Sequence, residues 1–183
     1  MKNIFFGTPI FAANILEFLA EKNVPLEKIV TQPDKPQGRS QKLSSPPVKK
    51  IAKICYPDVE ILQPVKASSK EFVEKIAKER SDHFIVVGYG QILKKALLEA
   101  TKLPINIHAS LLPKYRGASP IQRVLMDGEK ETGITIMQMN EKMDEGDILL
   151  QESFEISEDL SFGELERRLI DLSCKLILQT LFS

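Results

Sequence analysis

An amide and an imidazole stand two residues apart near the middle of the chain, at Asn106 and His108. The apolar residues Ile105 and Ile107 alternate with them, a period-two pattern that predicts a β-strand with both polar side chains on one face. These side chains offer hydrogen-bond donors, and the imidazole can also carry a proton. A turn-rich loop follows, and open α/β sheets bind ligands at such loops. Because a lone histidine in a strand is more often structural, a catalytic interpretation needs a second segment.

That second segment is an acidic, glycine-containing loop. It follows an apolar run at residues 134–139, which predicts a strand, and it offers three carboxylates, Asp144, Glu145 and Asp147. An amide, an imidazole and a carboxylate suit the transfer of a formyl-like acyl group to an amine. The amide N–H would stabilise the charge that develops on the carbonyl oxygen, the imidazole would exchange protons, and the carboxylate would orient the imidazole. On chemistry alone, any of the three carboxylates could serve.

The composition indicates one globular domain over residues 1–183. Hydrophobic residues make up 43% and charged residues 27%, so the chain is neither disordered nor membrane-spanning. The net charge is zero, so any polyanion must be held by a local patch. The two cysteines and two histidines are not clustered, and we expect no metal. The first residues lead into a strand pattern rather than a signal peptide, and we expect a cytoplasmic monomer.

Strand patterns alternate with helix patterns along the chain. Besides the Asn106/His108 strand, strands are predicted at residues 3–6, 26–31, 83–87, 133–139 and 148–156. Helices are predicted after Thr8, after Ser45, at residues 68–80, 91–100 and 119–127, and after a capping box formed by Ser161 and Glu164. This rhythm predicts an α/β fold, a doubly wound, mainly parallel sheet with helices on both faces. The first strand lacks the glycine fingerprint of a dinucleotide site.

A long basic loop follows the second predicted strand. Between residues 32 and 53 the sequence has one acidic residue, Asp34, among six basic ones: Lys35, Arg39, Lys42, Lys49, Lys50 and Lys53. Charge alone is compatible with a solvated loop or with a surface that binds phosphate groups.

Four segments resemble the folate-dependent formyltransferases: residues 106–108, 110–113, 115–117 and 143–147. The resemblance implies a Rossmann-like fold, 10-formyltetrahydrofolate as formyl donor, and Asn106, His108 and Asp144 as catalytic residues. It thereby favours Asp144 over its two acidic neighbours. The folate-binding residues it implies are Ser110, Leu111, Leu112 and Pro113, with Gly88, Tyr89 and Gly90 beside the pterin.

Further segments resemble the family members that formylate the methionine carried by initiator tRNA. They are residues 6–9, 31–36, 38–39, 47–49, 118–123 and 132–139, so the resemblance extends over nearly the whole chain. It implies tRNA contacts by Lys35, Arg39 and Lys42, with Arg39 in the position of the family's key arginine. Those members also carry a C-terminal β-barrel domain that helps to hold tRNA, and we expect residues 1–183 to be the catalytic domain without it.

Two alternatives stay open. A related enzyme could transfer the same formyl group to a small amine or to water, but the basic loop would then have no purpose. A folate-binding module without catalysis would bind its ligand equally well after loss of His108.

Overall fold

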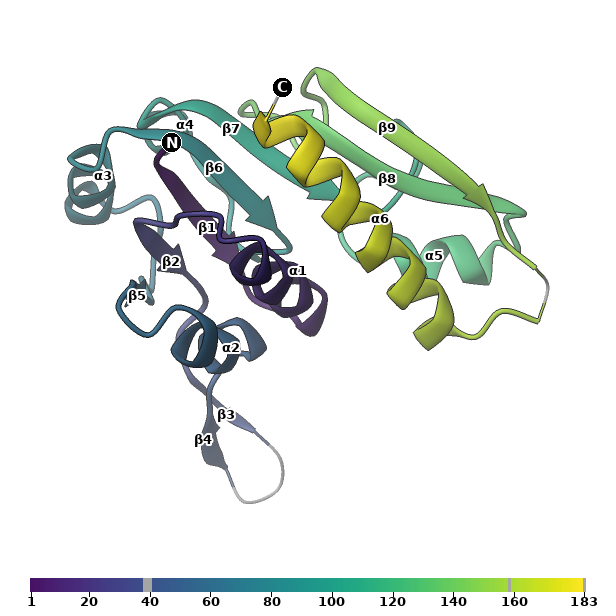
Figure 1. Cartoon of the computed structure of the whole chain (residues 1–183), viewed down its shortest axis with the longest axis horizontal. Coiled ribbons are helices and arrows are strands. Elements are labelled where there is room, and N and C mark those ends of the chain that lie inside the picture. The colour runs from purple at the N-terminus through teal and green to yellow at the C-terminus, as the bar shows by residue number, and fades with distance from the viewer. Residues whose placement is uncertain (38–40, 158, 183) are drawn as a thin grey trace. The chain divides into compact units, whose positions relative to one another are not determined.

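The computed structural model describes residues 1–37, 41–157 and 159–182. The chain forms two compact units, Met1–Pro104 and Ile105–Ser183, and we describe each by itself (Figure 1).

Parallel strands form the main sheet of the first unit. They are β1 (Asn3–Gly7), β2 (Lys28–Val30), β5 (Glu60–Leu62) and β6 (Ser81–Val87), in the order β5-β2-β1-β6. Ile4, Phe5 and Phe6 of β1 are fully buried. A continuous apolar run of this kind is typical of a parallel strand that is covered on both faces.

Helices and a small hairpin complete the first unit. The helices are α1 (Ile10–Glu21), α2 (Pro47–Cys55), α3 (Lys70–Ala77) and α4 (Lys95–Leu98), and the hairpin joins β3 (Lys35–Gln37) to β4 (Lys42–Ser44). The predicted capping residues differ in detail. Ser69 caps α3 in place of Ser68, with which the predicted helix began, and Thr8 and Ser45 bind other partners and leave prolines at the starts of α1 and α2. Proline suits a helix start because it lacks the N–H that would be unpaired there.

The second unit is antiparallel. The carboxyl end of β7 (Thr101–His108) pairs with β8 (Glu131–Gln138), and β8 pairs with β9 (Ile148–Glu155). Helix α5 (Pro120–Met126) lies between β7 and β8 in sequence, and α6 (Phe162–Phe182) runs along β8 and β9 (Figure 1). The apolar side of α6 is buried, including Leu165, Leu169 and Ile177.

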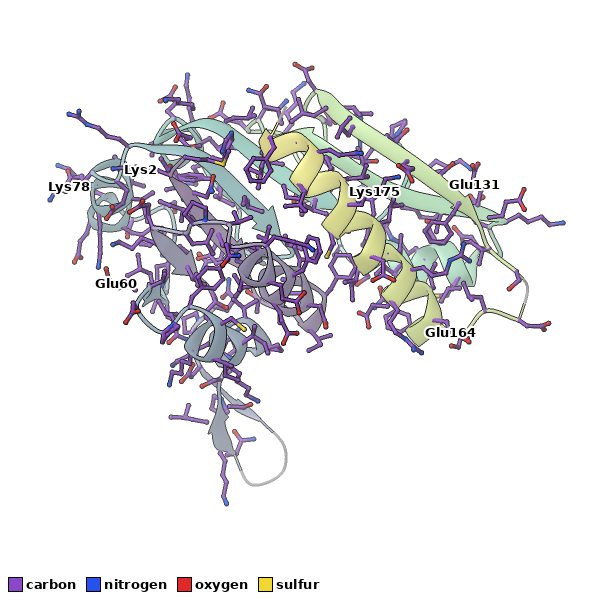
Figure 2. All side chains as sticks on the ribbon, viewed as in Figure 1. Lys2, Glu60, Lys78, Glu131, Glu164 and Lys175 are labelled. Atoms are coloured by element: carbon purple, nitrogen blue, oxygen red, sulfur yellow. The ribbon has the colours of Figure 1, made fainter. Side chains whose placement is uncertain are left out.

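Charged side chains support α6 from outside. Glu164, labelled in Figure 2, accepts hydrogen bonds from the backbone N–H and the hydroxyl of Ser161, and the Ser161 hydroxyl accepts one from the Glu164 N–H. The predicted capping box is therefore confirmed. Lys175, also labelled, forms an ion pair of 2.7 Å with Glu152 of β9.

The predicted α/β fold with a mainly parallel sheet is confirmed, since the pairs β5–β2, β2–β1 and β1–β6 are parallel. The strands predicted around the acidic loop exist as β8 and β9 and pair with each other. The sequence patterns did not indicate β3 and β4, which form a hairpin within the predicted loop. Among the described helices, none combines the length and the apolar character that a membrane crossing requires.

Candidate active site

Asn106 and His108 lie at the carboxyl end of β7, where the predicted alternation holds. Ile105 and Ile107 are buried, and in the antiparallel register Asn106 stands opposite Met137 and His108 opposite Thr135. The His108 side chain is only 7% exposed. The strand thus presents the amide and the imidazole from one face, with little freedom for the imidazole to turn.

Asp144, in the loop between β8 and β9, reaches the same place. Its Oδ1 accepts a hydrogen bond of 3.3 Å from Asn106 Nδ2, and its Oδ2 accepts one of 2.7 Å from the Gly117 N–H. The same Oδ2 lies 3.7 Å from His108 Nδ1. The structure therefore groups the three residues that the resemblance implied.

The local backbone explains why Asp144 and neither of its acidic neighbours occupies this position. Asp144 adopts a positive φ of 52°, and at Gly146 a side chain would overlap the backbone oxygen of Gln138. The loop therefore turns tightly against the end of β8 at a glycine. Glu145 instead faces Arg116, with its Oε1 3.3 Å from Nη1, and Asp147 is exposed.

The hydrogen bond of His108 determines which ring nitrogen holds the proton. Nε2 lies 2.9 Å from the backbone oxygen of Tyr115. A carbonyl oxygen only accepts hydrogen bonds, so Nε2 must be the donor and Nδ1 carries the lone pair in the neutral ring. Protonation at Nδ1 would direct an N–H towards the Asp144 carboxylate. Nδ1 is therefore the nitrogen available for proton transfer.

The turn at residues 115–117 contacts two of these side chains. Its Tyr115 carbonyl accepts from His108 and its Gly117 N–H donates to Asp144. Tyr115 and Gly117 both have positive φ, 60° and 86°. Arg123 of α5 donates from Nη2 to the Tyr115 oxygen at 2.9 Å and to the Arg116 oxygen at 2.6 Å. Sequence reasoning missed Arg123, because nothing in the sequence indicates which backbone carbonyls a side chain will reach.

Thr135 of β8 anchors the segment of residues 110–113. Its buried hydroxyl donates to the Ser110 oxygen at 2.7 Å and accepts from the Leu112 N–H at 3.1 Å. Gln151 of β9 donates to the same hydroxyl at 2.8 Å and to the Leu112 oxygen at 3.1 Å. Thr135 was also missed, although a threonine within a run of apolar strand residues was a signal of a buried polar group.

The predicted folate-binding residues of this segment divide into two kinds. Ser110 is fully buried, and its hydroxyl donates to the Lys114 oxygen at 2.7 Å, while Leu112 is 6% exposed. Leu111 is half-buried and Pro113 is exposed. Ser110 and Leu112 therefore maintain the loop conformation, and Leu111 and Pro113 are open to a ligand.

The other predicted folate residues, Gly88, Tyr89 and Gly90, belong to the first unit. The two glycines have φ values of 52° and 86°. The backbone carbonyl oxygen of Tyr89 accepts hydrogen bonds from the Thr8 hydroxyl at 2.8 Å and from the Gln32 side chain at 3.1 Å. Burial raises the pKa of the Tyr89 phenol. Within the described part of the chain, its hydroxyl has no hydrogen-bond partner.

Two of the three predicted tRNA-binding residues lie on the hairpin of the first unit. Lys35 and Lys42 are exposed on β3 and β4, and Arg39 lies outside the described residues. The acidic residue Asp34 stands at the base of the hairpin. It accepts hydrogen bonds from Gln63 at 2.7 Å and from Lys49 at 2.8 Å, and these contacts lower the pKa of its carboxyl. Lys49 therefore supports the hairpin from α2.

No group of three or more His, Cys, Asp or Glu side chains in residues 1–37, 41–157 and 159–182 is arranged to hold a metal ion. The site geometry therefore offers hydrogen-bond donors, one ring nitrogen for proton transfer and one carboxylate.

The sequences of known proteins agree with the family resemblance of the motifs. The sequence profile of the family described as "Formyl transferase" matches residues 1–181. The methionyl-tRNA formyltransferase of Caldicellulosiruptor saccharolyticus is 49% identical over 184 residues, with 99% of this chain and 58% of that protein covered. That of Protochlamydia amoebophila is 46% identical over 182 residues, with 99% and 57% covered. The chain thus spans less than two thirds of the length of these curated relatives.

Solved structures with lower identity share the fold. Phosphoribosylglycinamide formyltransferase from Streptococcus pneumoniae superposes with a TM-score of 0.79 at 22% identity, over 100% of this chain and 99% of that one. The enzyme of the same name from Bacillus halodurans gives a TM-score of 0.78 at 20% identity, over 96% and 91%.

Proposed function

The chain belongs to the formyl transferase family, and we propose that it transfers a formyl group from 10-formyltetrahydrofolate to the amino group of methionine on initiator tRNA, for translation initiation. The observation that carries the chemical part of this proposal is the grouping of Asn106, His108 and Asp144 by the contacts described above. The relatives named methionyl-tRNA formyltransferase support the acceptor. We further propose that residues 1–183 act as the catalytic domain.

The proposed chemistry moves one formyl group and one proton. The methionine amine attacks the formyl carbon, a new C–N bond forms, and the bond from that carbon to the folate nitrogen breaks. One amide hydrogen of Asn106 is directed at Asp144, which leaves the second for the carbonyl oxygen as negative charge develops on it. A single donor of this kind contributes about 3–4 kcal/mol in measured cases.

His108 and Asp144 handle the proton. Nε2 is occupied by the Tyr115 carbonyl, so Nδ1 accepts the proton that the amine loses and returns it to the departing nitrogen. The carboxylate of Asp144, 3.7 Å from Nδ1, faces the imidazolium that forms. Its own position depends on Asn106 and Gly117, so the carboxylate is held in place before the substrate arrives.

Binding residues follow from the same proposal. The segment of residues 110–113 would hold the folate, with Leu111 and Pro113 open to it and Ser110 and Leu112 maintaining the loop. The assignment of residues 88–90 to the pterin stays a prediction from the resemblance. Lys35, Arg39 and Lys42 would contact tRNA phosphates, and the exposure of the two described lysines supports this.

The test follows labelled formyl from 10-formyltetrahydrofolate in the presence of methionine-charged initiator tRNA. We expect the label on the methionine amine, and none when uncharged tRNA replaces the charged form. His108→Gln is the matched negative control, since it keeps a polar side chain but removes the ring nitrogen that is proposed to accept the proton. Label in free formate without tRNA would instead indicate a hydrolase. Folate binding without turnover, unchanged in His108→Gln, would indicate a binding module and refute the proposed reaction.

A further inference from the structure

We propose that Arg123 is a positioning residue for His108, which acts through the backbone carbonyl of Tyr115 and maintains the protonated Nε2 that leaves Nδ1 free. This inference rests on the function proposed above in so far as it concerns catalysis. Its structural part, the effect of Arg123 on the imidazole, can be measured without any reaction.

Arg123 contacts the turn at two backbone carbonyls. One nitrogen, Nη2, donates to two successive carbonyls, those of Tyr115 at 2.9 Å and of Arg116 at 2.6 Å. Two neighbouring carbonyls that converge on one point repel each other, and a cation between them removes that repulsion. Tyr115 also has a positive φ of 60°, which a residue with a side chain adopts only when its surroundings enforce it. Arg123 supplies that enforcement.

The turn contacts both partners of the proposed proton transfer. The Tyr115 oxygen accepts from His108 Nε2 at 2.9 Å as well as from Arg123, which its two lone pairs allow. Two residues later, the Gly117 N–H donates to Asp144 Oδ2 at 2.7 Å. A shift of the turn would therefore move His108 and Asp144 together. Arg123 connects the backbone of this turn to helix α5, and the Tyr115 hydroxyl adds a hydrogen bond of 2.9 Å to Asp127 at the end of that helix.

Among the described residues, Arg123 leaves part of its hydrogen-bonding capacity unused. Its Nε is buried and has no hydrogen-bond partner within the described residues. A buried unpaired donor lowers stability, so the guanidinium gives up one hydrogen bond while it reaches the two carbonyls. Its carbon also lies 5.7 Å from the centre of the Tyr115 ring. The side chain therefore contacts the turn through both the backbone and the aromatic ring.

The chain offers a direct measurement, because it contains only two histidines. His83 Nδ1 lies 2.9 Å from Asn3 Oδ1, and the Asn3 amide nitrogen donates to the Pro25 oxygen, so His83 carries its proton on Nδ1. His108 carries its proton on Nε2. The ¹⁵N NMR spectrum of the neutral imidazoles should therefore show two opposite tautomers, with His83, in the first unit, as an internal reference for the opposite tautomer.

The variants are Arg123→Ala and Arg123→Lys, with Arg168→Ala as the matched control. Arg168 also belongs to the second unit, donates to the Glu155 oxygen at 3.2 Å and lies 4.0 Å from the centre of the Phe154 ring. It makes the same kinds of contact as Arg123 without a contact to the 115–117 turn. Arg168→Ala therefore shows the effect of losing an arginine that stacks on an aromatic ring. The additional effect in Arg123→Ala comes from the lost contact to the turn.

In Arg123→Ala we expect His108 to populate both tautomers, His83 to stay unchanged, and kcat to fall at least tenfold with unchanged folate affinity. Arg123→Lys should recover part of kcat and of the Nε2-protonated population, since an ammonium also donates to two carbonyls. Retention of a single Nε2 tautomer and of kcat within twofold of Arg168→Ala would overturn the inference. So would a wild-type His108 that is protonated on Nδ1.

Failure of the proposed function would look different. It would appear as an absence of formyl transfer by the wild-type chain, and the tautomer spectra would still decide the role of Arg123. Should Arg123→Ala lose its cooperative urea transition, the same comparison is made with Arg123→Lys.

Discussion

Replacement of Thr135 by valine should destabilise the second unit by an amount that follows from its contacts. Valine has almost the same shape but lacks the hydroxyl, which here forms three hydrogen bonds: to the Ser110 oxygen, from the Leu112 N–H and from Gln151. Gln151 is exposed and can bond to water. The other two groups lie within buried residues, and each orphaned group costs about 1–2 kcal/mol. We therefore expect a loss of about 2–4 kcal/mol in the free energy of unfolding.

Urea denaturation measures this loss. With a slope of about 2 kcal/mol per molar urea, the midpoint for Thr135→Val should fall by about 1–2 M. Thr135→Ser is the control, because it keeps the hydroxyl and loses one methyl group, at a cost of about 1 kcal/mol. A valine variant as stable as the serine variant would show that the hydroxyl does not hold the 110–113 segment, and the reasoning would be wrong. The folate affinity of Thr135→Val should also fall.

Three further outcomes are expected. Asp144→Asn should lower kcat about 10²–10³-fold with little change in stability, whereas Asp147→Asn should stay near wild type in the same formyl-transfer assay. Burial lowers the pKa of His83 below 6.5. The unfolded chain therefore binds the proton more readily than the folded chain, and the free energy of unfolding should fall as the pH drops below 6.5. In His83→Gln, the urea midpoint should lack this part of the pH dependence. Lys35→Ala and Lys42→Ala should each weaken tRNA use and reduce its salt dependence by about one unit of slope, and a slope unchanged in both would contradict the contact.

Local patterns predicted those parts of the fold that depend on neighbours in sequence. The alternation around Asn106 and His108 predicted a strand with both side chains on one face, because successive side chains of a strand point to opposite sides. The spacing of Ser161 and Glu164 predicted a helix start, because the two side chains pair with each other's backbone. Strands β1, β2 and β6 of the first unit were recognisable as apolar runs between turns, whereas the three-residue strand β5 was not predicted. The catalytic roles themselves stay a prediction.

Patterns failed where a contact depends on segments that are distant in sequence. The hairpin of β3 and β4 has exposed, polar strands, so no burial pattern indicated it. Thr8 and Ser45 are good capping residues by type, yet their hydroxyls bind Tyr89 and Asp34 instead. A hydroxyl has several possible acceptors of similar energy, and packing decides which of them it meets.

The sequence by itself determined the type of fold, the chemistry available on β7 and in the acidic loop, and, through its resemblance to a known family, the preference for Asp144. Only the tertiary structure decided which nitrogen of His108 is free, which side chain holds the turn beside it, and which hydroxyl anchors the 110–113 segment. The physical reason is that these three contacts end on backbone groups. Every residue carries a backbone carbonyl, so the residue types do not indicate which carbonyl will accept a hydrogen bond. That depends on where the folded chain places each carbonyl.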